Sequence, residues 1–204
     1  MTALVATEYI NIEREINITQ EMLVATSHPR LYAGQRVSVL DLLYPLLMES
    51  SNEAGEAIAS ILGKERFVGL MNEKAQAIGM SNSHFTDTTG ADPGNISTAQ
   101  DLFQLAKYLY NNRGFILGIS RGETQLSVYG LSPWRDLKNF NVFDQDPGFI
   151  GGKVGMTNAA GETIISIFEV VSASTTRPVA VVALESANRA GDASALIDYV
   201  RNSY

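Results

Sequence analysis

The sequence of 204 residues contains no cysteine, only two histidines and a single tryptophan. Without cysteine, the chain has no disulfide, no thiolate nucleophile and no cysteine-based metal site. His28 and His84 lie far apart in the sequence and form no His-Glu-x-x-His pattern, so nitrogen ligands for zinc are also too few. We therefore expect no metal site.

Positive charge is also scarce. The chain has 15 Lys and Arg against 22 Asp and Glu, a net charge of −7 and a sequence pI near 4.8. Such a protein repels polyanions, so we expect no nucleic-acid partner. No apolar run reaches the roughly 18 to 20 residues that cross a bilayer, and no basic segment opens the chain. We expect neither a transmembrane segment nor a signal peptide within these residues.

The apolar residues present have helical spacing in the middle of the chain. Ser38 and Asp41 form a start signal for the helix "VLDLLYPLLMES", and Asn52 is expected to cap the next one. Residues 15–25 alternate weakly, as an exposed or extended segment does. The other predicted helices are 1–10, about 65–78 ending at Gly79, one starting at Ser97, and one within "DASALIDYV" near the end.

From residue 123 the apolar period changes to two, which predicts strands. The predicted strands are "ETQLSVYG", "LKNFNVF", "ETIISIFEVV" and "PVAVVALES", and Lys153 is placed on a strand as well. Helices, then consecutive strands, then a helix predict an α+β fold with an antiparallel sheet covered by helices. We expect one domain over 1–204, with a helical region at about 38–121, a sheet region at about 123–186 and a terminal helix at about 189–203.

Two local patterns imitate known sites. "GISRG" matches the Gly-x-Ser-x-Gly nucleophile elbow, but Ser120 follows a helix and precedes a strand, and both histidines come earlier in the chain. A plain turn explains it better than an esterase. Lys153 is not part of a phosphate loop, because Pro147 and Val154 replace required residues. His84 is interpreted as a packing or turn histidine.

Polar residues at two other boundaries are harder to dismiss together. In "ESSNEAGEA", Ser50 and Asn52 stand where one helix ends and a small-residue helix begins, so both side chains are placed to enter a cleft. Helix capping alone would explain them, just as solvation alone would explain Lys153 on a strand. The order Ser-x-Asn, followed about a hundred residues later by Lys-x-Gly, calls for a common explanation.

This order resembles the serine acyl-transferases that bind penicillin, with their Ser-x-x-Lys, Ser-x-Asn and Lys-Thr-Gly motifs. Specifically, the chain resembles the D-alanyl-D-alanine carboxypeptidases, or low-molecular-mass penicillin-binding proteins. The resemblance extends over most of the chain, through the phrases "MTALVA", "VSVLDLLYPLLMESSNEAGEAIA", "AIGMSNSHFTDTTG", "STAQDLFQLAKYL", "GGKVGMTNAAGETIISIF" and "VVALESANRAGDASALIDYV". It implies a β-lactamase-like fold, here with N-terminal strands missing from the sheet.

The chain departs from the family pattern at two places. No serine is followed by lysine three residues later, whereas the family has that motif just upstream of the Met-Thr-Ala-Leu phrase. The first helix also begins at Met1 without a cap, so we expect the chain to start downstream of its nucleophile and to be inactive as it stands. Val154 replaces the family's threonine, which removes a hydroxyl for a substrate carboxylate; Thr157 is a candidate to replace it.

The resemblance also assigns roles. Lys153 would orient the carboxylate of a peptide ending in D-Ala-D-Ala, and Gly155 would let the peptide pair with the strand. The N–H of Met156 would form half of an oxyanion hole. Ser50 would relay a proton to the departing D-alanine, and Asn52 would donate to the peptide carbonyl.

By this resemblance, the complete protein would be an extracytoplasmic serine-type hydrolase of the cell envelope. It would bind peptidoglycan peptides and β-lactams, and it would need no metal and no organic cofactor. Two alternatives stay open. One is a peptidoglycan-binding module without any nucleophile, and the other is an esterase that uses Ser120.

Overall fold

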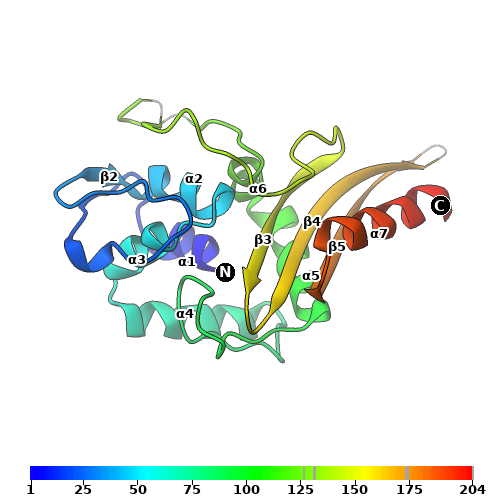
Figure 1. Ribbon diagram of the computed structural model, residues 1–204, viewed down its shortest axis with the longest axis horizontal. Coiled ribbons are helices and arrows are strands. Elements are labelled where there is room, and N and C mark those ends of the chain that lie inside the picture. The colour runs from blue at the N-terminus through cyan, green and yellow to red at the C-terminus, as the bar shows by residue number, and fades with distance from the viewer. Residues whose placement is uncertain (126, 131, 173–174, 204) are drawn as a thin grey trace.

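The chain forms a helical part and a three-stranded sheet that lie side by side (Figure 1). The computed structural model describes residues 1–125, 127–130, 132–172 and 175–203. Its elements are, in chain order, α1 (Thr2–Tyr9), β1 (Glu15–Asn17), the 3-10 helix η1 (Gln20–Met22), β2 (Arg36–Ser38), α2 (Val39–Met48), α3 (Asn52–Ser60), α4 (Lys64–Ala77), α5 (Ala99–Asn112), α6 (Gly114–Ser120), β3 (Phe149–Thr157), β4 (Gly161–Ser172), β5 (Thr175–Ser186) and α7 (Arg189–Ser203).

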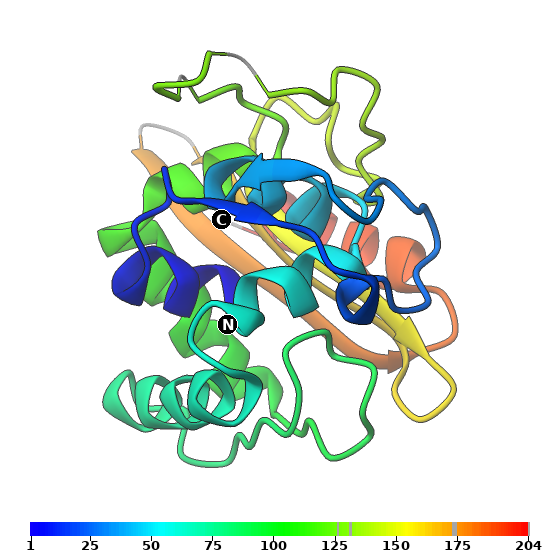
Figure 2. The ribbon, with the colours of Figure 1, turned by 90° about the vertical axis from the view of Figure 1, so that its left-hand side faces the viewer.

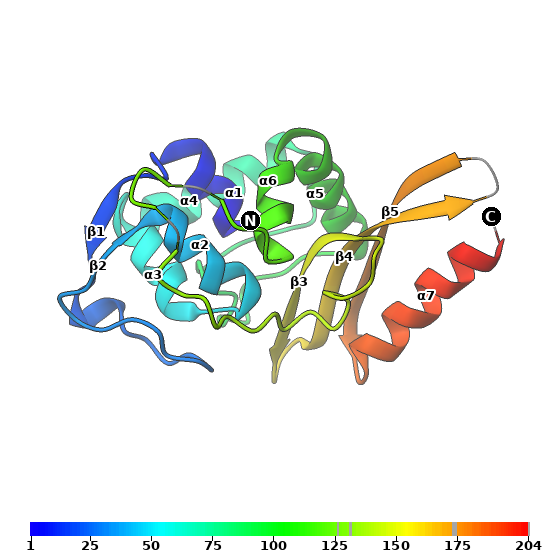
Figure 3. The same ribbon diagram turned by 90° about the horizontal axis from the view of Figure 1, so that it is seen from above.

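The larger sheet has the order β3-β4-β5, and both pairs are antiparallel. Helices cover its two faces, with α5 and α6 on one face and α7 on the other (Figure 3). Seen from the helical side, the N-terminal helices lie in front of the strands (Figure 2). Among the described strands, β3 pairs only with β4, so one edge of β3 faces the helical part.

Three apolar clusters of the described residues hold these layers together. The helical core joins α1 to α4 and includes Leu4, Leu43, Ile58 and Phe67. The second core lies between the sheet and α7, and it includes Val154, Ile164, Phe168 and Ile197. A third, small cluster joins α5 and α6 to the other face of the sheet through Ala106, Leu117 and Ile167.

The predicted helices are present, with corrections at two of their starts. Ser38 caps α2 by accepting from the backbone of Asp41 at 3.1 Å, as predicted. The cap of α3, however, is Ser51, whose Oγ accepts from the Ala54 amide at 3.2 Å, so Asn52 is already the first helical residue. Likewise α5 is capped by Thr98, one residue after the predicted start.

The predictions from period two were right for β4 and β5, Lys153 lies on a strand, β3, as expected, and the antiparallel α+β class is confirmed. The predictions from period two were wrong for segments 123–130 and 137–143, because their described residues form no β-ladder. Residue 126 lies outside the described residues. The amides of these segments bond to other groups, for example from Phe140 to the Met48 carbonyl at the end of α2. Segment 15–25 is a strand only at Glu15–Asn17 and then turns into η1.

Candidate active site

The junction of α2 and α3 places three polar residues in a row. Ser50 has a φ of 57°, in the left-handed region that residues with a side chain seldom adopt. This turn lets Ser51 cap α3 while the Ser50 hydroxyl points away from both helices toward β3. Backbone of this kind often marks a functional site, because the rest of the structure must hold it in place.

A buried ion pair stabilises this turn at the residue that precedes Ser50. Arg30 donates to both carboxylate oxygens of Glu49, from Nε at 2.7 Å and from Nη2 at 2.6 Å. Glu49 is 1% exposed and also accepts from the Lys138 amide at 3.0 Å. Burial acts to raise the pKa of Glu49, but the Arg30 and Lys138 hydrogen bonds outweigh it and hold the pKa below its ordinary value. The residue before Ser50 is thus fixed as a carboxylate.

Lys153 reaches this junction from the middle of β3. Its Nζ donates to the Ser50 Oγ at 2.8 Å and also to its neighbour's carbonyl, that of Val154. Side chains alternate along a strand, so Lys153, Gly155 and Thr157 share the face toward the helical part. Val154 faces the other way and packs in the core against α7, at 6% exposed.

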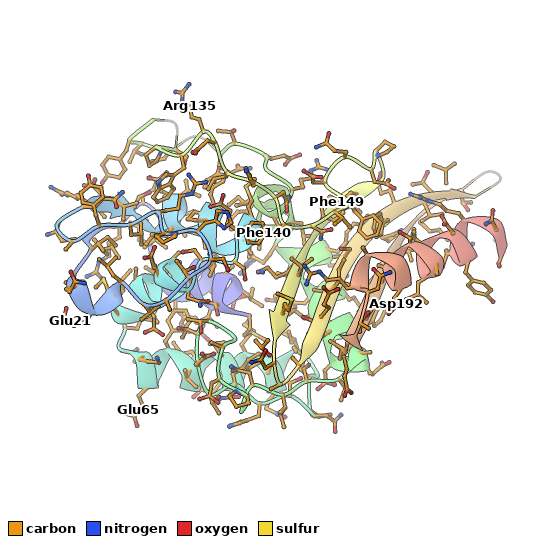
Figure 4. The ribbon with its side chains drawn as sticks, viewed as in Figure 1. Glu21, Glu65, Arg135, Phe140, Phe149 and Asp192 are labelled. Atoms are coloured by element: carbon orange, nitrogen blue, oxygen red, sulfur yellow. The ribbon has the colours of Figure 1, made fainter. Side chains whose placement is uncertain are left out.

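The space around these residues is hollow. A cavity of about 500 Å³ is bordered by Ser50, Asn52, Lys153 and the strand segment 154–157. Phe140, labelled in Figure 4, lies between α2 and β3 and borders it as well. A second, more apolar cavity of about 250 Å³ also touches Ser50 and Lys153, and the start of α1 lines it. Ser50 and Lys153 therefore stand where the two cavities meet.

The electrostatics of the larger cavity are positive at one end. Burial, together with the charge of Arg189, lowers the pKa of Lys153 to about 8. The ammonium form still predominates at pH 7, and a bound anion would favour it further. This cavity can therefore orient a carboxylate.

Every residue predicted for the site borders this cavity, although their contacts differ. The amide of Asn52 donates to the Ala25 carbonyl at 2.8 Å, which fixes its angle and leaves its second N–H. Met156 is 71% exposed at the rim. The hydroxyl of Thr157 accepts from the Ala160 amide at 3.0 Å and so closes the turn between β3 and β4. The roles assigned to these residues remain proposals.

The residues of the cavity that the sequence reasoning missed include two beside Gly155. Arg189, the first residue of α7, donates from Nη1 to the Gly155 carbonyl at 3.0 Å. Thr163 of β4 is the register partner of Gly155. A cation at a helix start opposes the helix dipole, and this was the one available signal for Arg189. Thr163 had none, because only the register of the strands brings it to Gly155.

The imitations found in the sequence have structural explanations. Ser120 is 2% exposed, and its Oγ donates to the Leu117 carbonyl at 2.7 Å and accepts from the Gly152 amide at 3.0 Å. It thereby joins α6 to β3. His84 forms an antiparallel bridge with Ile96 through its backbone. Within the described residues, no three His, Asp or Glu side chains gather as metal ligands, and no helix is long and apolar enough to cross a bilayer.

Comparison with known proteins gives the same picture. The chain is 30% identical over 174 residues to a D-alanyl-D-alanine endopeptidase of Escherichia coli K12. The matched residues make up 81% of this chain and 56% of that protein. The chain thus spans little more than half of that relative's length. Among solved structures, a D-alanyl-D-alanine carboxypeptidase from Mycobacterium tuberculosis H37Rv has a TM-score of 0.82 and 26% identity, covering 98% of this chain and 78% of that one.

A second solved structure extends the likeness. Penicillin-binding protein D2 from Listeria monocytogenes, in its cefotaxime-bound form, has a TM-score of 0.78 and 25% identity, covering 97% of this chain and 82% of that one. The fold is therefore that of the penicillin-binding proteins. Residues 1–195 also match the family described as D-alanyl-D-alanine carboxypeptidase. The chain belongs to the D-alanyl-D-alanine carboxypeptidase family.

Proposed function

We propose that the complete protein is a serine-type D-Ala-D-Ala carboxypeptidase that acts on peptidoglycan stem peptides. The single observation that carries this proposal is the hydrogen bond from Lys153 to Ser50 across a cavity that also contains Asn52. An ammonium, a hydroxyl and an amide from distant segments are the groups that an acyl-transfer reaction on an anionic peptide requires.

In the proposed reaction, a serine oxygen attacks the carbonyl of the penultimate D-alanine. The bond to the terminal D-alanine breaks, and its nitrogen takes the proton that the serine lost. Ser50 passes this proton on, Asn52 donates to the peptide carbonyl and Lys153 orients the terminal carboxylate. Water then hydrolyses the acyl-enzyme and releases the shortened peptide.

In this proposal the serine nucleophile lies outside residues 1–204. No serine here precedes a lysine by three positions. We propose that a Ser-x-x-Lys segment joined to α1 supplies it, and that the 204 residues alone are inactive. The proposal is supported by the position of Met1 and Thr2, which line the same cavity as Ser50 and Lys153. A serine one or two turns before α1 would extend into that cavity.

The same proposal covers the cellular setting. Residues 1–204 would be one part of a catalytic domain that works outside the cytoplasm, where peptidoglycan is found. β-lactams would acylate the same serine, as cefotaxime occupies the Listeria protein. Neither a metal nor an organic cofactor takes part in the proposed steps.

Labelling with a fluorescent penicillin tests the proposal. A protein extended upstream through Ser-x-x-Lys should be labelled covalently, whereas the 204 residues and an extended variant with that serine changed to alanine should not. If the extended protein stays unlabelled while its thermal unfolding is normal, the carboxypeptidase proposal is wrong.

The competing functions give different results. A peptidoglycan-binding module without a nucleophile would have no Ser-x-x-Lys codons upstream of Met1, and it would bind the peptide without any turnover. An esterase based on Ser120 would hydrolyse an aryl ester in the present form and lose that activity in Ser120→Ala. The two hydrogen bonds that already hold the Ser120 hydroxyl argue against the esterase.

A further inference from the structure

Thr163 stands directly opposite Gly155 in the pairing of β4 with β3. Cross-strand partners project on the same face of a sheet, so the Thr163 side chain shares the face of Lys153 and borders the cavity. A Cβ built on Gly155 would lie 2.7 Å from the Thr163 Oγ1. The Thr163 hydroxyl thus lies close to Gly155, next to the position that a side chain at residue 155 would occupy.

The Thr163 hydroxyl is not engaged in holding the fold. Within the described residues, no side-chain hydrogen bond involves the Thr163 hydroxyl, whereas Lys153 and Arg189 both form such bonds along this wall. Thr163 is half-buried and faces the cavity. An O–H donor that is positioned but unused is available to a ligand.

The charges around it define what that ligand is. Lys153 and Arg189 border the same cavity, and the Arg189 guanidinium is held at 3.0 Å from the Gly155 carbonyl. Two cations and one hydroxyl around a single glycine match the acceptor oxygens of a carboxylate. The neighbouring Val154 cannot contribute, because it has no hydroxyl and its side chain packs toward α7.

We propose that Thr163 is a specificity-determining residue, whose hydroxyl donates to the terminal carboxylate of the bound peptide. It would take the place of the hydroxyl that Val154 lacks, from the neighbouring strand. This inference rests on the proposed function. It predicts that a free carboxylate is preferred over a carboxamide in part because of this one hydroxyl.

The test uses the 204-residue chain, which lacks a Ser-x-x-Lys motif, so that equilibrium binding is measured without turnover. The probes are N-acetyl-L-lysyl-D-alanyl-D-alanine and the same peptide with a C-terminal amide, titrated by calorimetry at pH 7. The variants are Thr163→Val, which keeps the shape, and Thr163→Ser, which keeps the hydroxyl. Thr176→Val on β5 is the matched control, because Thr176 is exposed and pairs with Val171 away from the cavity.

Thr163→Val should weaken binding of the acid about 10-fold, the range for a hydrogen bond to a charged group, and weaken binding of the amide clearly less, because a hydrogen bond to a neutral oxygen is weaker. Thr163→Ser and Thr176→Val should stay within about 2-fold of the parent chain. Thermal unfolding of each variant checks that the fold is kept.

Equal loss for acid and amide, or no loss at all, would overturn the role of Thr163, as would an effect found in Thr157→Val instead. The failure of the proposed function looks different. In that case the unmodified chain itself would show no preference for the acid over the amide, and the inference about Thr163 would fall with it.

Discussion

The guanidinium of Arg30 donates two hydrogen bonds to the carboxylate of Glu49, the residue that precedes Ser50 in the turn. The Glu49 side chain is fully buried and that of Arg30 is 15% exposed. An ion pair this deep in the protein is costly to break, because the remaining charge is left without a partner. It links the stability of the fold to the position of the proposed proton relay.

Arg30→Met should therefore lower the free energy of unfolding by about 3 kcal/mol. Arg36→Met is the matched control, since Arg36 forms its ion pair with Glu15 at the surface, and it should cost less than about 1 kcal/mol. Urea unfolding at pH 7 measures both. Equal effects would mean that the buried pair does not hold the turn.

The Glu49 carboxylate also gives this stability a pH dependence. Its pKa is lower in the folded chain than in the unfolded one. The contribution is therefore complete above the unfolded pKa of about 4.3 and is lost as the pH falls through the lowered folded value. Glu49→Gln should flatten this acid limb of the stability curve. An unchanged acid limb in that variant would show that other carboxylates cause it.

The left-handed backbone of Ser50 makes a second stability prediction. Glycine adopts a φ of 57° without strain, whereas alanine keeps the strain and loses the hydroxyl. Ser50→Gly should be more stable than Ser50→Ala by about 1 kcal/mol. Both should lose penicillin labelling in the extended protein, because Lys153 then has no hydroxyl to contact. If the two variants unfold alike, the turn is not strained.

Two glycines of β3 should respond differently to alanine. A Cβ on Gly152 would press against the Ile165 carbonyl and lie 2.8 Å from the Ser166 Oγ, so Gly152→Ala should destabilise the sheet by about 2 kcal/mol. A Cβ on Gly155 meets only the Thr163 hydroxyl, which faces the cavity. Gly155→Ala should change stability little and weaken binding of the acid peptide. If Gly155→Ala destabilised the sheet more than Gly152→Ala, the faces of β3 assigned to these two residues would be wrong.

Binding of the acid peptide should follow the titration of Lys153. Its pKa of about 8 means that the ammonium persists at neutral pH and is lost as the pH rises. The affinity should be constant below about pH 8 and then fall up to tenfold for each further pH unit. Arg189→Met removes a charge that lowers this pKa, so the affinity of that variant should begin to fall at a higher pH. If the affinity begins to fall at the same pH in that variant, the charge of Arg189 does not influence Lys153.

The sequence predicted those parts of the fold that depend on local rules. Ser38 and the stripe of leucines after it specify α2, and period two specifies β4 and β5. The cap of α3 was misassigned because Ser51 and Asn52 are both good capping residues, and only the left-handed turn at Ser50 decides between them. Segment 137–143 has the pattern of a strand but bonds to the end of α2.

The site was predictable only where a motif marks it. Ser50, Asn52 and Lys153 were found by their order in the chain, and they do border one cavity. Arg189 and Thr163 belong to no such pattern. Arg189 reaches the cavity because α7 begins there, and Thr163 reaches it because the register of β4 places it opposite Gly155. Both depend on how distant segments pack. The roles of all five residues depend on the bound peptide.

The most direct measurement is the equilibrium affinity of the 204 residues and of Lys153→Met for N-acetyl-L-lysyl-D-alanyl-D-alanine and its C-terminal amide at pH 7. The unmodified chain should bind the acid with a Kd below about 1 mM and the amide at least about tenfold more weakly, and Lys153→Met should reduce this difference to the part that Arg189 and Thr163 supply. A Lys153→Met chain that prefers the acid as strongly as the unmodified chain does would contradict the account.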